Sequence, residues 1–103
     1  MTDAERDALN AEYALNAEYA VACKGLDLGA YATWAGHIDY LSSDAELGRR
    51  VKALAIRHDD SEIDIRDCGR KVGIDGHELF KGKDLEEATM RACIALKVPV
   101  PNA

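Results

Sequence analysis

Apolar residues recur at helical spacing through the first quarter of the chain. Residues 2–5 read Thr-Asp-Ala-Glu, a capping box in which a hydroxyl and a carboxylate bind amide groups at a helix start. Gly25 supplies the residue type that commonly ends a helix. These two signals predict a helix over residues 3–24.

Two further helices are predicted before the first strand. After Asp27, apolar residues return at helical spacing to about residue 40, although Gly29 and Gly36 weaken the pattern. Residues 43–46 form a second capping box, Ser-Asp-Ala-Glu. We expect the helix that it opens to end near His58.

After His58 the spacing of apolar residues changes from that of a helix to that of a strand. Residues 62–66 alternate polar and apolar side chains, which predicts a half-buried strand. Residues 71–74 predict its partner, and the Asp75-Gly76 dipeptide that follows is typical of tight turns. We therefore expect an antiparallel sheet of two strands, or of three if residues 77–80 also pair.

A last helix is predicted after Asp84, which can cap it. Its expected buried stripe consists of Leu85, Ala88, Ala92 and Leu96. Pro99 and Pro101 cannot continue a helix and predict an extended end.

The order of these elements predicts an α+β fold. We expect three N-terminal helices, a small antiparallel sheet of two or three strands, and a C-terminal helix packed in one domain. That domain spans residues 1–103, with a helical part over 1–58 and a β-hairpin plus helix over 59–103.

The predicted first helix contains one hexapeptide twice, ALNAEY over residues 8–13 and again over 14–19. Six residues rotate a helix by about 600°, so each copied side chain points about 120° away from its original. Tyr13 and Tyr19 therefore face different directions, and the helix carries two apolar stripes where a surface helix needs one. Two interpretations stay open: a duplication that good helix formers tolerate, or a second surface that binds a partner.

Charge is distributed unevenly along the chain. Residues 1–48 contain two basic and nine acidic side chains, whereas residues 49–103 contain eleven basic and ten acidic ones. The net charge of −6 makes a nucleic-acid coat protein an unlikely class, and no apolar run is long enough to suggest a membrane protein. The acidic start lacks signal-peptide features, so we expect a cytoplasmic protein whose three cysteines are reduced.

Two groups of side chains are candidates for partner binding besides Tyr13 and Tyr19. The predicted helix after residue 43 is the most basic element, with Arg49, Arg50, Lys52 and Arg57. The acids that follow it favour a solvated face over an acidic-partner surface. Met90 and Ile94 fall opposite the buried stripe of the last helix, among charged residues, and also suggest a contact surface.

Catalytic, metal and cofactor motifs are not recognisable. Residues 76–84 differ from a phosphate loop in glycine spacing, and Asp84 replaces the required Ser or Thr. The Cys and His residues lack metal-ligand spacing, and only Cys68 with His77 suggests a zinc half-site. A small-ligand site or an enzyme would depend on His37, His77 or Cys68. We expect no enzyme activity, no metal and no cofactor.

The C-terminal half carries a family resemblance. Its relevant stretches are the capping box over 43–46, Glu-Ile-Asp-Ile over 62–65, Val-Gly-Ile over 72–74, and the alanine-rich segment 82–96 with its Arg-Ala pair. In this order, residues 43–98 resemble small phage-encoded α/β sandwich proteins of no assigned activity. The resemblance implies a phage or prophage accessory protein in a bacterial cytoplasm, and it transfers no catalytic residue.

These features together predict a small acidic protein-binding module. We expect an inhibitor or adaptor that acts on another protein and forms a homo-oligomer through its N-terminal helix, whose acidic surface would cover a basic groove. Two alternatives stay open: a nucleic-acid binder that uses the basic helix over residues 49–57, and a small-ligand binder.

Overall fold

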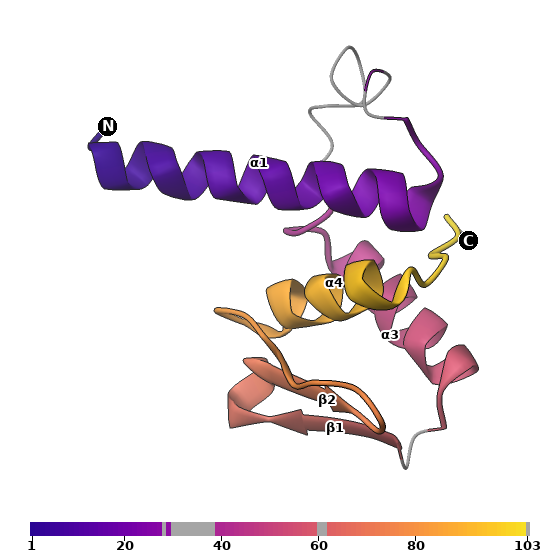
Figure 1. The fold of residues 1–103 in the computed structure, drawn as a ribbon. Coiled ribbons are helices and arrows are strands. Elements are labelled where there is room, and N and C mark those ends of the chain that lie inside the picture. The colour runs from indigo at the N-terminus through magenta and orange to yellow at the C-terminus, as the bar shows by residue number, and fades with distance from the viewer. Residues whose placement is uncertain (28, 30–38, 60–61, 103) are drawn as a thin grey trace.

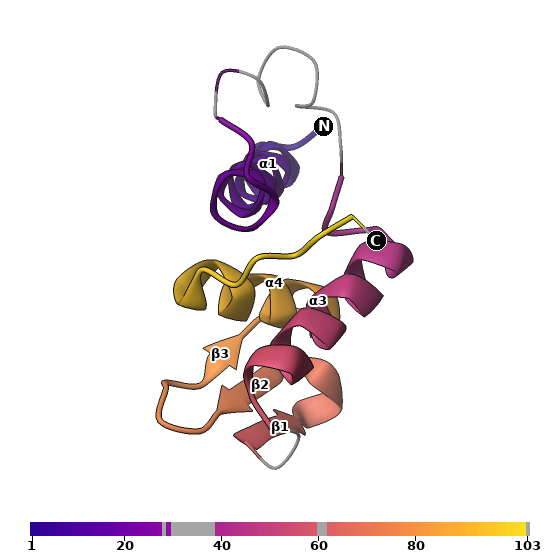
Figure 2. The ribbon, with the colours of Figure 1, turned by 90° about the vertical axis from the view of Figure 1, so that its right-hand side faces the viewer.

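A computed structural model of the chain describes residues 1–27, 29, 39–59 and 62–102. These residues form three stacked layers: one long helix, two shorter helices, and a sheet (Figures 1 and 2). The helices are α1 (Asp3–Lys24), α3 (Asp44–Arg57) and α4 (Leu85–Leu96). The strands are β1 (Ile63–Arg66), β2 (Lys71–Ile74) and β3 (Phe80–Lys81).

The helix starts follow from their capping residues. Thr2, Ser43 and Asp84 each accept a hydrogen bond from the amide three residues later. Gly25 ends α1 with a φ of 73°, in the left-handed region that glycine adopts without strain. The prediction of a helix over residues 3–24 is confirmed with the same bounds.

The number of helices before the sheet differs from the prediction. Within the described ranges, two α-helices precede the sheet and one follows it, which makes three rather than four. The helix that we expected after Asp27 falls mainly on residues 28 and 30–38, which lie outside the described residues. The α+β class itself is confirmed.

The sheet is antiparallel in the order β1-β2-β3. Its first two strands have the predicted positions, whereas the third begins at Phe80 because the chain turns over residues 75–79 before it pairs. Val72, Ile74 and Phe80 are buried on the inner face beneath α4. The outer face has no described element over it (Figures 1 and 2).

The position of α4 between α1 and the sheet corrects one prediction. Met90 was expected on an outer face of this helix, but its exposed fraction is 0%. A helix in the middle layer packs on both sides, so a single buried stripe does not describe it. The segment after α4 packs against the body through alternate residues: Val98 and Val100 are buried, Pro99 between them is exposed, and the Val100 amide donates to the Cys23 carbonyl at 2.9 Å.

The length and apolar character of the helices show whether any of them could cross a membrane. Of those in the described part of the chain, none combines the length and the apolar character that a bilayer crossing requires.

Candidate functional site

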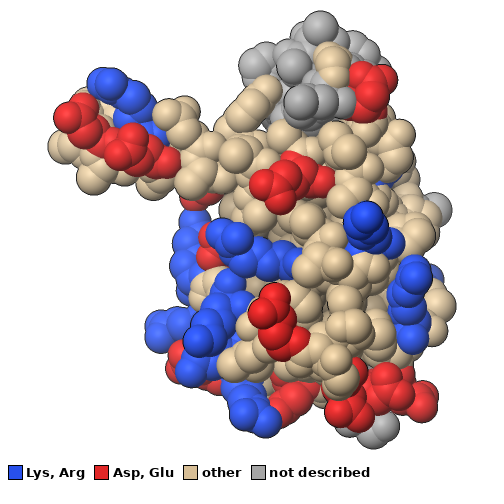
Figure 3. Space-filling view, in the orientation of Figure 1, with Lys and Arg blue, Asp and Glu red and all other residues tan. Residues whose placement is uncertain are grey.

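The N-terminal half of α1 extends beyond the body of the molecule (Figures 1 and 3). Residues 3–14 have exposed side chains, apart from Glu12, which is half-buried. All buried side chains of this helix lie in its second half. We call residues 3–14 the arm; at 1.5 Å per residue it measures about 18 Å.

The boundary between arm and body lies within one residue of the boundary between the two hexapeptide copies. In the second copy, Leu15 is 6% exposed and Tyr19 is 0% exposed. In the first copy, Leu9 is 51% exposed and Tyr13 is 48% exposed. One sequence of six residues therefore packs into the core once and lies at the surface once.

The packed copy shows what this hexapeptide can bind. Asn16 donates from Nδ2 to Asp39 Oδ1 at 3.2 Å and accepts from the Leu41 amide at 3.0 Å. Tyr19 donates its hydroxyl hydrogen to Glu46 Oε2 at 2.7 Å. Leucine, asparagine and tyrosine of the copy thus combine apolar burial with hydrogen bonds to another segment of protein.

Glu46 is the centre of a buried polar cluster. Lys24 Nζ and Arg49 Nη1 both lie 2.9 Å from its Oε1, and Tyr19 binds the other oxygen. Burial by itself raises the pKa of the Glu46 carboxyl, but the hydrogen bonds from Tyr19, Lys24 and Arg49 outweigh it and hold the pKa below its usual value. Because protein encloses this carboxylate, we assign the cluster to folding rather than to binding.

Besides Met90, two more of the predicted partner-binding residues lie in the interior. Arg50 is 0% exposed, and it donates to the carbonyls of Tyr40 and Glu86 and to the Thr89 hydroxyl over 3.2–3.3 Å. Its guanidinium also lies over the Tyr19 ring, 5.3 Å from the centroid. The expectation that Arg50 and Tyr19 are on a contact surface is therefore wrong.

The remaining predicted residues are partly accessible. Lys52 and Arg57 are exposed on α3, whereas Arg49 is half-buried and bound to Glu46. The basic helix thus presents fewer cations to a partner than its sequence indicates. Ile94 is half-buried beside a groove of about 450 Å³ between α1, β3 and α4.

The sheet brings together three cations that we did not predict to be neighbours. Arg66 is directly opposite Lys71 across β1 and β2, and Lys71 is directly opposite Lys81 across β2 and β3. Residues opposite each other in an antiparallel pair point to the same face, with Cα atoms about 5 Å apart. We call Arg66, Lys71 and Lys81 the cationic row.

The cationic row has little compensating charge. Arg66 pairs with Asp64, whereas Lys71 and Lys81 form no ion pair with any described residue. Like charges directly opposite each other in a sheet are destabilising. Figure 3 shows basic side chains gathered at the lower left of the molecule, at this end of the sheet.

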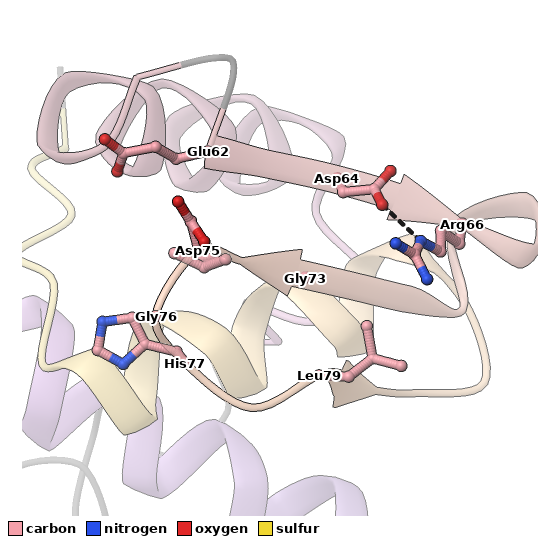
Figure 4. Close-up of a pocket in the computed structure, with 9 residues that line it drawn as sticks. Glu62, Asp64, Arg66, Gly73, Asp75, Gly76, His77 and Leu79 are labelled. Carbon is pink, nitrogen blue, oxygen red and sulfur yellow. Dashed lines mark hydrogen bonds and ion pairs between the residues drawn. The ribbon is translucent and has the colours of Figure 1, made fainter.

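A depression of about 470 Å³ adjoins the cationic row on the outer face of the sheet (Figure 4). Gly73 leaves its centre open, because glycine has no side chain between its neighbours Asp64 and Leu79. Arg66 lines the end near the row, and His77 lines the other end together with Glu62 and Asp75.

Of the two described side chains that we considered for a metal or small-ligand site, His77 lines the depression and Cys68 does not. His77 follows β2, whereas Cys68 lies between β1 and β2 at the opposite end of the sheet, so the structure does not bring together the two side chains that suggested a zinc half-site. No group of three metal-ligating side chains occurs within the described ranges. His37 lies outside them.

Comparison of the chain with family models, with curated proteins and with solved structures gives no match. The candidate site is therefore defined by geometry: the arm and the outer face of the sheet. The sequence did contain a signal for the cationic row, since the predicted hairpin of residues 62–66 and 71–74 already sets Arg66 opposite Lys71.

Proposed function

We propose that the protein is a protein-binding module that docks through the arm. The observation that carries this proposal is the duplicated hexapeptide, of which one copy packs against a protein surface and the other is displayed on a projecting helix. A helix laid into a groove binds through side chains at helical spacing, and the displayed copy offers Leu9, which lies near the middle of the arm.

The charge of the arm determines which surface it fits. Asp3, Glu5, Asp7 and Glu12 outnumber the single base, Arg6. The ion pair of Asp3 with Arg6 is exposed at 3.9 Å, and Glu12 contacts Lys83 of the body at 2.7 Å. The complementary surface on the partner is therefore basic and contains an apolar pocket that accepts Leu9.

The resemblance of residues 43–98 to phage-encoded proteins extends this proposal. It supports an adaptor or inhibitor that acts on a bacterial protein in the cytoplasm, where the acidic arm would cover a basic groove. In this role the arm contributes specificity and association rate through complementary charge, while Leu9 contributes apolar burial.

Site-specific photo-crosslinking in bacterial cells tests the proposal. A crosslinking amino acid replaces Leu9 in one variant and Ile56 in the control, since Ile56 is 78% exposed on α3, away from the arm. We expect a discrete protein adduct from position 9 that is lost when Glu5→Lys and Asp7→Lys are added. Identical adducts from positions 9 and 56, or no adduct from position 9, would contradict the proposal.

A further inference from the structure

The basic surface that the arm requires is present on the chain itself. We propose that the arm binds the outer sheet face of a second copy of this chain, with Glu5 against the cationic row and Leu9, one turn from Glu5 on the same helix face, beside Leu79. This inference rests on the proposed function and names a second copy of the chain, in place of a host protein, as the partner of the same site.

The charge of the row supports an acidic occupant. Lys71 is directly opposite Lys81, and neither forms an ion pair with another described residue. The repulsion between these two like charges destabilises the folded protein. An anionic partner would offset this repulsion by neutralising both ammonium groups. The arm is the most acidic projecting element among the described residues, with Glu5 and Asp7 exposed to solvent.

The same face also offers an apolar contact. Leu79 is 37% exposed and lines the depression over Gly73, two positions before Lys81 of the row. Leu9, 51% exposed, stands between the acidic residues of the arm. Burying two leucines together at an interface contributes association free energy that electrostatic screening by salt does not weaken.

The fold keeps the arm of a molecule away from the cationic row of the same molecule. The arm belongs to the layer on one side of α4, and the outer face of the sheet is on the other side (Figures 1 and 2). At the base of the arm, Glu12 binds Lys83 of the body. Two copies related by a rotation of 180° can each place an arm on the other's sheet, which closes the assembly as a dimer.

Charge reversal combined with mass measurement tests this dimer. The arm variant carries Glu5→Lys and Asp7→Lys, and the row variant carries Lys71→Glu and Lys81→Glu. The control carries Lys52→Glu and Arg57→Glu, which change net charge as much as the row variant does, on two exposed cations of α3. Light scattering coupled to size exclusion, over a wide range of protein concentration in low salt, gives the mass of each.

We expect the wild type and the control to have twice the mass of one chain, and salt at about 0.5 M to weaken the dimer by screening. The arm variant and the row variant should each be monomeric alone. Mixed in equal amounts, they should regain the doubled mass, because one contact then joins the reversed arm to the reversed row and the other joins a native arm to a native row, both between opposite charges. A charge effect on folding alone gives no such rescue.

Three results would overturn the inference. They are a wild type that stays monomeric at every concentration, a mixture that does not regain the doubled mass, and a row variant that keeps its mass but loses retention on heparin. The last result would make the row a polyanion site. If the wild type is monomeric while position 9 still gives its arm-dependent adduct with a different protein, the inference fails and the proposed function stands.

Discussion

Lys24 and Glu46 form an ion pair inside the protein: Nζ lies 2.9 Å from Oε1, and the two side chains are 3% and 4% exposed. The pair joins the end of α1 to the start of α3. The same ammonium group donates to the Val100 carbonyl at 2.8 Å, so one lysine ties three segments of the chain together. The buried ammonium group is tolerated because the Glu46 carboxylate and the Val100 carbonyl both accept hydrogen bonds from it.

Removal of the carboxylate should therefore be costly. We expect Glu46→Gln to lower the free energy of unfolding by about 3 kcal/mol, because it leaves the Lys24 ammonium buried without its counter-charge. Urea unfolding measures the loss. Asp64→Asn is the control, since its ion pair with Arg66 is exposed and its loss should cost less than about 1 kcal/mol. Equal losses in both variants would mean that the Glu46 pair is not important for stability.

Acid should weaken the protein through the same carboxylate. The pKa of Glu46 is lowered in the folded state, since hydrogen bonds from its partners outweigh the effect of burial, so the unfolded chain binds the proton more readily. Its contribution is complete at neutral pH, declines as the pH falls past the unfolded value of about 4.3, and is lost as the pH falls through the folded value. Asp39 acts in the same direction. Burial raises the pKa of its carboxyl, but hydrogen bonds from Ser42 and Asn16 have the larger effect, so its pKa is lowered overall.

Urea unfolding from pH 7 to pH 3 checks this dependence. The difference in unfolding free energy between wild type and Glu46→Gln should be largest at neutral pH and should narrow in acid, where the wild-type carboxyl also becomes neutral. A difference that stays constant down to pH 3 would contradict the role assigned to the ionised carboxylate.

The two hexapeptide copies allow one substitution to be made twice in the same local sequence. We expect Leu15→Ala to cost about 3 kcal/mol of unfolding free energy, because it leaves a cavity in the core. Leu9→Ala should change stability by less than about 0.5 kcal/mol, since Leu9 is 51% exposed. The same substitution changes helix propensity equally at both positions. The difference between the two variants in thermal or urea unfolding therefore measures the contribution of side-chain packing. Similar losses would mean that the arm is packed in solution.

Thiol reactivity should separate one cysteine from the other two. Burial raises the pKa of Cys23 to about 11 and that of Cys93 to about 12, whereas Cys68 is exposed. Ellman's reagent at mildly alkaline pH should label one thiol rapidly in the folded protein and the other two only on unfolding. Cys68→Ser should abolish the rapid reaction. A rapid reaction that survives this substitution would place a second thiol at the surface.

Much of the fold follows from local sequence, because its determinants act within a few residues. Thr2, Ser43 and Asp84 cap the helices that follow them, and Gly25 ends the first one. Alternation over residues 62–66 gives β1. Such interactions join groups close in the chain, so residue type and spacing are sufficient to predict them.

The tertiary structure alone decided which parts of these elements face water. The two ALNAEY copies are identical, so no local property separates Leu15 in the core from Leu9 at the surface; the body of the protein ends between them. Arg50 and Met90 looked like surface residues because their helix patterns assume one buried face. The middle layer packs on two sides, and hydrogen bonds from other elements compensate the buried guanidinium.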